Sequence, residues 1–304
     1  MSDFGLNFWD NLQEIFQYPF MRNAFIAGTI IAIVAGIVSY FVVLRRSSFA
    51  AHALGHIGFA GAAGAVLLGV NPVLGLLAFT TVSGSGIAIL GKRASQRDVE
   101  IGAVLAFMLG LGVLFISLYS GYATETYSIL FGEILGISES EVLLTLFVSL
   151  AVLVAIVVVY RPLLFASLDE DVAEAKGMPT LLLGIVFMLL LAVAISIAVQ
   201  VVGVLLIFSL LVLPAAIAFR LEKRPLHAIV ISVLVALFAT WSGLFIGWYE
   251  PYPVSFFITT IVFAIYVVVR FGVRPRAMPG PARARNPPAP RAVSAATKSP
   301  ATDS

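Results

Sequence analysis

The chain has 304 residues, of which 61% are hydrophobic and only 11% are charged, and it contains no cysteine. Soluble domains are about 45–50% apolar and about 25% charged, so a soluble fold of this length could not bury so much apolar surface. The lack of cysteine excludes disulfides, thiolate metal sites and a cysteine nucleophile. A net charge of +2 offers no basic surface for nucleic acid. The composition therefore predicts an all-α membrane protein, because lipid accommodates outward apolar faces.

Nine segments are apolar enough to cross a bilayer, which takes about 20 residues of helix. They lie at residues 23–44, 50–70, 72–91, 99–120, 141–160, 181–199, 201–219, 226–247 and 254–271. The run between 181 and 219 is interrupted only by Gln200 and Gly203, so it could form two short spans or one long broken span. We therefore expect a polytopic transmembrane helical bundle with eight or nine spans.

Basic residues follow alternate spans, beginning with Arg45 and Arg46 after the first. The others are Lys92, Arg93, Arg97, Arg161, Lys176, Arg220, Lys223, Arg224, Arg270, Arg274 and Arg276. The intervening loops carry mainly acidic residues, among them Glu133, Glu139 and Glu141. Because positively charged loops remain in the cytoplasm, we expect a multi-pass protein of the plasma or inner membrane. Its N-terminus would lie outside and its C-terminus in the cytoplasm.

Three regions follow from this layout. Residues 1–22 are expected to form an amphipathic lead-in at the outer side, with aromatic interfacial anchors. Residues 23–273 form the transmembrane domain. Residues 274–304 are rich in Pro, Ala and Arg and cannot bury enough apolar area to offset their ordering entropy. We expect them to be a disordered cytoplasmic tail.

The sequence HALGH, from His52 to His56, lies at the start of the second span. Residues four apart share one helix face one turn apart, which suits two ligands of one transition metal. Ionisable residues within a span are costly and mark functional sites. Hydrogen bonding to neighbouring helices is the alternative, but only His227 occurs elsewhere, and the pair favours a metal site. A two-fold dimer or water would complete the coordination shell.

The longest polar stretch before the tail runs from residue 169 to 179. It should form a short cytoplasmic helix that ends near Gly177 and Pro179. A solvated loop and a docking surface for a cytoplasmic partner both fit this composition. The residues of interest are Asp169, Glu170, Asp171, Glu174, Lys176 and Gly177.

Two polar residues near the outer side, Gln200 and Glu250, are candidates for an entrance, although Glu250 also suits an ordinary interfacial loop. The sequence contains no catalytic triad, HExxH motif or paired carboxylates in a plausible context, so we do not expect an enzyme. Residues 86–92 match G-x-x-x-x-G-K, but Arg93 follows where a phosphate-binding loop needs Ser or Thr. Any ATP must therefore be hydrolysed by another chain.

Four blocks, in order, resemble the metal-type ABC permeases of zinc, manganese and iron uptake systems. They are Phe41–Gly64 (FVVLRRSSFAAHALGHIGFAGAAG), Arg97–Ser117, Leu130–Ser138 (LFGEILGIS) and Leu168–Arg220. The last block is the most specific, and together they cover most of residues 40–225. The resemblance implies a permease homodimer with two copies of a separate ATPase docked against the segment 169–179. It also implies an extracytoplasmic binding protein that delivers the metal, and transport by alternating access.

The family's metal-path residues match this chain at His52 and His56, but the family usually has Asp at the first position. An Asp/His set suits manganese, whereas this His-richer set favours zinc, followed by manganese or iron. The metal is a transported substrate, and we expect no permanently bound cofactor. Around Glu250, the sequence WYEPYPVS departs from the family's Asp-Leu-Pro pattern, so the resemblance gives no site there.

Two other functions remain open. A permease for a metal chelate, such as a siderophore or cobalamin, would need a wide pathway without paired ligands. An ATP-independent secondary metal transporter would run on an ion gradient, but the sequence shows no internal repeat of the kind that such folds use. Replacing both histidines by alanine would abolish import of a free ion and leave chelate transport nearly intact.

Overall fold

The computed structural model describes residues 14–90, 94–119, 132 and 134–273. The tail at 274–304 and most of the expected lead-in lie outside this part. Every regular element within it is a helix. The helices are α2 (Pro19–Leu44), α3 (Ser48–Leu67), α4 (Pro72–Leu90), α5 (Ala94–Leu118), α7 (Glu139–Leu168), α8 (Glu170–Ala175), α9 (Thr180–Val202), α10 (Val204–Leu221), α11 (Pro225–Tyr249) and α12 (Val254–Gly272).

Eight of the described helices are long and apolar enough to cross a membrane, and α10 adds a shorter apolar helix, Leu206–Leu221. This confirms the predicted bundle of eight or nine spans. The first spanning helix begins at Pro19, earlier than the predicted residue 23, because proline with its fixed φ is accepted in a first helical turn. The apolar run between 181 and 219 divides at Gly203. Its φ of 82° is a conformation that glycine adopts readily, and it ends α9 before α10 begins.

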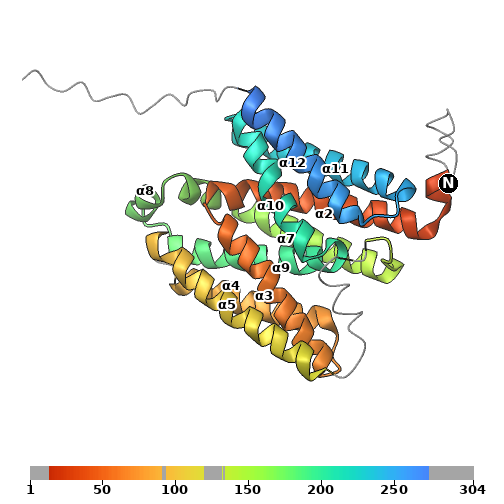
Figure 1. Cartoon of the computed structure of the whole chain (residues 1–304). Coiled ribbons are helices and arrows are strands. Elements are labelled where there is room, and N and C mark those ends of the chain that lie inside the picture. Colours follow the sequence, from red (N-terminus) through yellow and green to blue (C-terminus); the bar gives the residue numbers. More distant parts are fainter. Residues whose placement is uncertain (1–13, 91–93, 120–131, 133, 274–304) are drawn as a thin grey trace, which may run out of the picture. The chain divides into compact units, whose positions relative to one another are not determined.

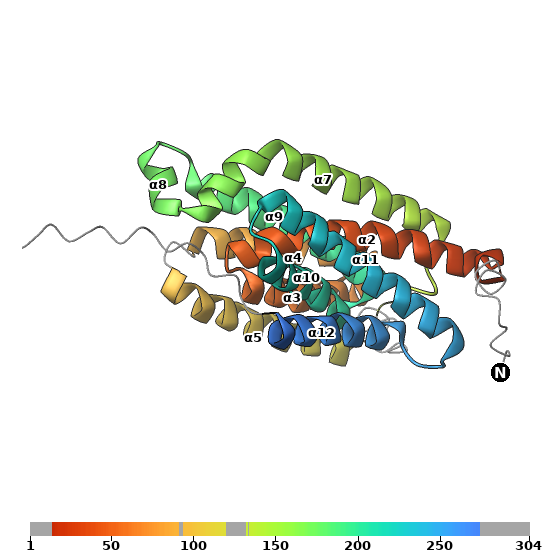
Figure 2. The ribbon, with the colours of Figure 1, turned by 90° about the horizontal axis from the view of Figure 1, so that it is seen from above.

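The helices form three groups that are visible side by side in Figure 1. Helices α11 and α12 pack on each other and on α2 and α10, whereas α3, α4 and α5 form a separate group. Helices α2, α9 and α10 join these groups, and α7 packs on α2 and α9. Figure 2 shows α7 on the opposite side of the bundle from α5 and α12. Helix α3 is the most buried of the candidate spans, at 78%, and also the least hydrophobic. An interior position explains how the bundle tolerates its two histidines.

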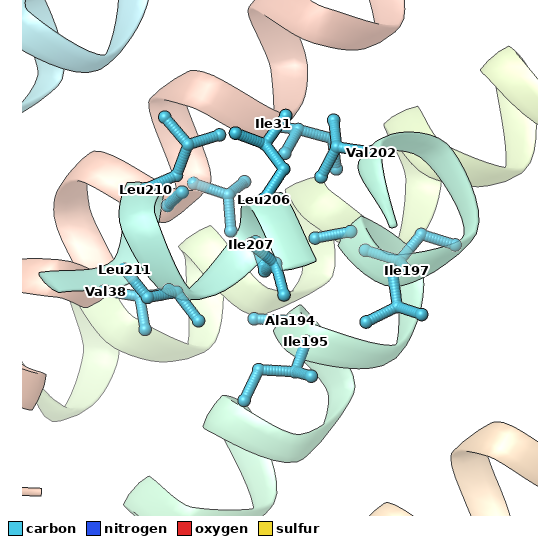
Figure 3. Close-up of a cluster of buried hydrophobic side chains, with 14 of the residues drawn as sticks. Ile31, Val38, Ala194, Ile195, Ile197, Val202, Leu206, Ile207, Leu210 and Leu211 are labelled. Carbon is cyan, nitrogen blue, oxygen red and sulfur yellow. The ribbon is translucent and has the colours of Figure 1, made fainter. Parts of the chain in front are cut away.

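The core is centred where α2, α9 and α10 meet (Figure 3). Ile31 of α2, Ile195 of α9 and Leu210 of α10 are each at most 1% exposed. The broken α9–α10 run thus places two apolar helices against the same face of α2. Such packing in lipid depends on van der Waals contact, since lipid tails are themselves apolar.

Glycines bring α3 close to its neighbours. A Cβ atom on Gly61 would collide with the carbonyl oxygen of Gly75 and lie 2.7 Å from Cβ of Phe79, both on α4. A Cβ on Gly64 would lie 2.8 Å from the ring of Phe115 on α5. Small residues of this kind let helix backbones approach closely in membranes. The glycine-rich character of α3 is therefore explained by packing.

Two contacts among the described residues involve charged residues at the ends of the bundle. Arg220, at the end of α10, donates a hydrogen bond to the backbone carbonyl of Arg270, at the end of α12, over 2.9 Å. Figure 1 shows α8 at one end of the bundle and the start of α2 at the other. At that second end Arg22 is the described exception to the acidic pattern, and its guanidinium lies 3.5 Å from the carboxylate of Glu139.

Candidate functional site

The two histidines of α3 lie against each other. Their ring centroids are 4.6 Å apart, with an edge-to-face angle of 78°. The ring of His52 also meets Phe208 of α10 edge to face, with centroids 4.8 Å apart. Both histidines are half-buried. The helical spacing therefore produces the predicted juxtaposition, with an aromatic ring on one side of it.

The described residues of one chain do not complete a metal shell around this pair. They contain no group of three or more His, Cys, Asp or Glu side chains that could hold a metal ion. Two imidazoles alone leave positions open for water, a transported ion or a second copy of the chain. The remaining exposure of the His52 and His56 side chains leaves access for such groups. Chemically, the pair can hold a divalent transition metal through neutral ring nitrogens and release it again.

The helix expected between residues 169 and 179 is present as α8. The Asp169 side chain caps it by accepting a hydrogen bond from the Val172 amide at 3.0 Å. Gly177 follows with a φ of 75°, and Ala173 is fully buried against α7 and α9. The predicted residues all lie on the exposed side: Asp169, Glu170, Asp171, Glu174, Lys176 and Gly177. A capped, anchored helix therefore presents a charged surface beyond the bundle.

Of the two predicted entrance residues, only Gln200 lies in a cavity. Its Nε2 donates a hydrogen bond to Oε1 of Glu141, at 3.1 Å, and both residues line a cavity of about 420 Å³. Glu250 is exposed at the end of α11 and lines neither of the described cavities. Gln200 and Glu250 therefore do not form one site, and the carboxylate that contacts Gln200 is Glu141.

Sequence reasoning missed the role of Glu141 at this position. Its Oε2 accepts a hydrogen bond from the Ser138 backbone amide, and its own backbone amide donates to the Ser138 hydroxyl oxygen, so the two residues form a capping box at the start of α7. The Ser138 hydroxyl also donates to Oε2. The pattern of Ser followed three residues later by Glu before an apolar run was a readable signal for that helix start. The partnership with Gln200, 59 positions away, had no local signal.

Comparisons with known proteins agree on one family. Residues 17–272 match the model of the ABC 3 transport family. A manganese transport system membrane protein, MntC, from Listeria monocytogenes is 30% identical over 79% of this chain and 85% of its own length. A manganese import system permease protein, ScaB, from Streptococcus parasanguinis is 31% identical over 88% of this chain and 95% of its own length.

A solved structure agrees with these relatives. The structure of PsaBC from Streptococcus pneumoniae in complex with a Fab contains a chain that superposes with a TM-score of 0.78 and 29% identity. The match covers 86% of this chain and 95% of that chain. The shared fold therefore extends over nearly the whole transmembrane part.

Proposed function

Because the chain belongs to the ABC 3 transport family, as a membrane permease of the metal-transporting type, we propose that it imports a divalent transition metal into the cytoplasm. The observation that carries this proposal is the contact between His52 and His56 on a buried helix. In the proposed mechanism, the pair binds the ion when it faces one side of the membrane and releases it to the other. Such a site must hold the ion weakly enough to let it leave.

The proposed working unit is a homodimer. One copy offers two imidazoles, and a two-fold axis near α3 would bring four together, enough for a tetrahedral shell. The partial exposure of both rings in the single chain supports this arrangement. The described residues of one copy also offer no third His, Cys, Asp or Glu ligand beside this pair, which supports the dimer as well.

Energy would come from a separate ATPase that docks on α8. The exposed acidic residues of α8 and its anchoring through Ala173 support a docking role, since a rigid, charged helix can transmit a push from a partner. The basic residues that follow alternate spans support a cytoplasmic location of α8, by the positive-inside rule. The N-terminus would then lie outside, where a metal-binding protein delivers the ion.

Manganese is the favoured substrate, with zinc and iron next. The relatives named above carry manganese in their names, and they give no support to the preference for zinc that the two histidines suggested. Imidazole ligands accept manganese as well as zinc, and the oxygen ligands that manganese prefers can be supplied by water. This chain has His52 where the family usually has aspartate, so its selectivity between manganese and zinc can be tested at that position.

The proposal is tested by uptake of radiolabelled manganese and zinc in cells that lack their own importers. The cells carry the chain with its ATPase and binding protein, either as wild type or as His52→Ala/His56→Ala. We expect wild-type cells to accumulate manganese and the double variant to lose uptake while it reaches the membrane in equal amount. Undiminished uptake by the double variant would reject the histidine site. The histidines would then be packing residues, and the metal path would have to be sought elsewhere in the chain.

A further inference from the structure

The cavity that contains Gln200 lies at the end of the bundle opposite α8. Its walls come from the first turns of α4, the segment that enters α7, and the last turn of α9. Its lining contains no Lys, Arg or His, and Glu141 is the one carboxylate among the described lining residues. Ser140 and Asn71 add further polar groups. The electrostatic character of this cavity therefore favours a cation over an anion.

Gln200, which lines this cavity, has a buried oxygen acceptor that lacks a partner. Since Nε2 of Gln200 donates to Glu141, the amide is oriented with Oε1 turned elsewhere, and that oxygen is buried without a hydrogen bond from any described residue. Buried carbonyl oxygens are normally satisfied by protein, water or an ion. Glu141 keeps a lone pair on Oε1, because the backbone amide and the hydroxyl of Ser138 both donate to its other oxygen, Oε2.

The polar face of α7 continues inward from Glu141. Thr145 and Ser149 follow at intervals of one turn and are 0% and 1% exposed. Their hydroxyl oxygens are buried and make no hydrogen bond within the described part of the chain. Helical Ser and Thr hydroxyls often bond to the carbonyl four residues earlier, so these two are unusual. Neither residue is among the described lining residues of the cavity, so the two hydroxyls extend the polar face of α7 without forming the cavity wall.

The neighbouring charges leave Glu141 available. Arg22 is engaged with Glu139, which lies on α7 two residues before Glu141 and does not line the cavity. A carboxylate, an amide oxygen and hydroxyls are hard ligands, which suit manganese, magnesium or calcium better than softer metals. One carboxylate gives low affinity, as a site of passage requires.

We propose that this cavity is a low-affinity capture site for the transported divalent cation, with Glu141 supplying the charge and Gln200 Oε1 a neutral oxygen ligand. The proposal rests on the import function described above. Water molecules complete the shell, since hard cations keep several of them. Because its ligands are oxygens, this site selects for manganese before the ion reaches the nitrogen ligands on α3.

The histidine helix contributes no residue to the described lining of the cavity, but Leu76 of α4 contacts both. Leu76 lines the cavity, and a Cβ atom on Gly58 of α3 would lie 3.2 Å from Leu76. Gly58 is two residues after His56, on the side of α3 that faces α4, whereas the His52 ring faces Phe208 of α10. The capture site therefore lies beside the histidine helix, one side chain away from it.

Manganese binding to the purified full chain in lipid nanodiscs tests the capture site. The electron paramagnetic resonance signal of free aqueous manganese reports the bound fraction. All variants carry His52→Ala/His56→Ala, so that only the outer site is measured. Glu141→Gln removes the charge, yet it retains the capping box, which accepts Gln as well as Glu. Glu139→Gln is the matched control, because it removes a carboxylate from the same helical turn outside the cavity. All variants also carry Arg22→Gln, so that loss of the Arg22–Glu139 ion pair cannot leave a guanidinium free to pair with Glu141.

We expect Glu141→Gln to weaken manganese binding about tenfold, the scale of a lost charged ligand, and Glu139→Gln to leave it unchanged. Gln200→Leu should weaken binding as well, whereas Gln200→Glu should strengthen it, a gain that a purely structural role would not produce. Equal affinity for Glu141→Gln and Glu139→Gln would overturn the capture site. That result is distinct from failure of the import function, which is read from uptake by the histidine double variant.

Discussion

Arg45 donates a hydrogen bond from its guanidinium to the hydroxyl of Ser167 over 3.1 Å, and the same guanidinium lies 5.3 Å from the centroid of the Phe187 ring. Arg45 ends α2 just before the histidine helix begins. Ser167 belongs to the last turn of α7, and Phe187 to α9, the two helices that flank α8. One side chain thus connects the end of α2 to both of the helices that flank α8, the helix that we propose as the ATPase contact.

Replacing Arg45 by alanine should therefore weaken both stability and coupling. A hydrogen bond from a charged donor contributes about 1.5–3 kcal/mol, and thermal unfolding in detergent would measure the loss. The ratio of metal transported to ATP hydrolysed should fall. Arg46→Ala is the control, because Arg46 is exposed. Arg45→Lys should be intermediate, since lysine keeps the charge without the planar group that stacks on Phe187. Equal melting temperatures and coupling ratios for the two alanine variants would contradict this role.

The contact between α3 and α4 predicts a steep cost for enlarging Gly61. The added methyl group of Gly61→Ala would meet the backbone of Gly75, which cannot move aside as a side chain could. We expect a loss of about 1–3 kcal/mol, as for other overpacked sites. The control is Gly110→Ala in α5, where no atom lies within 4 Å of the added carbon. That change should stabilise the helix by up to about 1 kcal/mol. Denaturation midpoints of the two variants, compared with wild type, decide the matter.

The metal preference should respond to the first histidine. His52→Asp exchanges a nitrogen ligand for a carboxylate, which favours manganese over zinc. We expect the ratio of manganese to zinc uptake to rise about tenfold, equivalent to 1.4 kcal/mol of relative affinity. Competition between the two metals in the same cells measures this ratio directly. The control is His227→Asp, at a histidine in α11 outside the pair. An unchanged ratio in the His52→Asp cells would show that His52 does not contact the ion.

The cap of α8 should decide how firmly that helix is formed. A six-residue helix is marginal by itself, and loss of an N-cap costs about 1 kcal/mol. Asp169→Ala should therefore raise hydrogen exchange in α8 about fivefold and reduce metal-stimulated ATP hydrolysis by the complex. Asp169→Asn keeps the capping oxygen and removes the charge, so it should retain both properties. If the asparagine variant were as impaired as the alanine variant, the charge would matter and the cap would not.

Several features of this protein follow from the sequence alone. Long apolar runs form helices in lipid because a helix satisfies its own backbone hydrogen bonds, so the bundle was predictable. Most helix ends lie within a few residues of the prediction, but α7 continues to Leu168, well beyond the predicted end at 160. The spacing of His52 and His56 fixed their contact, since a helix places residues four apart on one face. Local signals likewise predicted α8, where Asp169 and Gly177 mark its two ends.

Other features depend on contacts between distant segments, which no local pattern encodes. The partnership of Glu141 with Gln200, the tie from Arg45 to Ser167 and the position of Phe208 beside His52 all join separate helices. Helices in a membrane choose their neighbours through close packing of small residues and a few polar contacts, and these depend on three-dimensional shape. The sequence determined which segments span and which residues are candidate ligands. The tertiary structure decided which of those residues meet, because side chains that are remote along the chain come together only through packing.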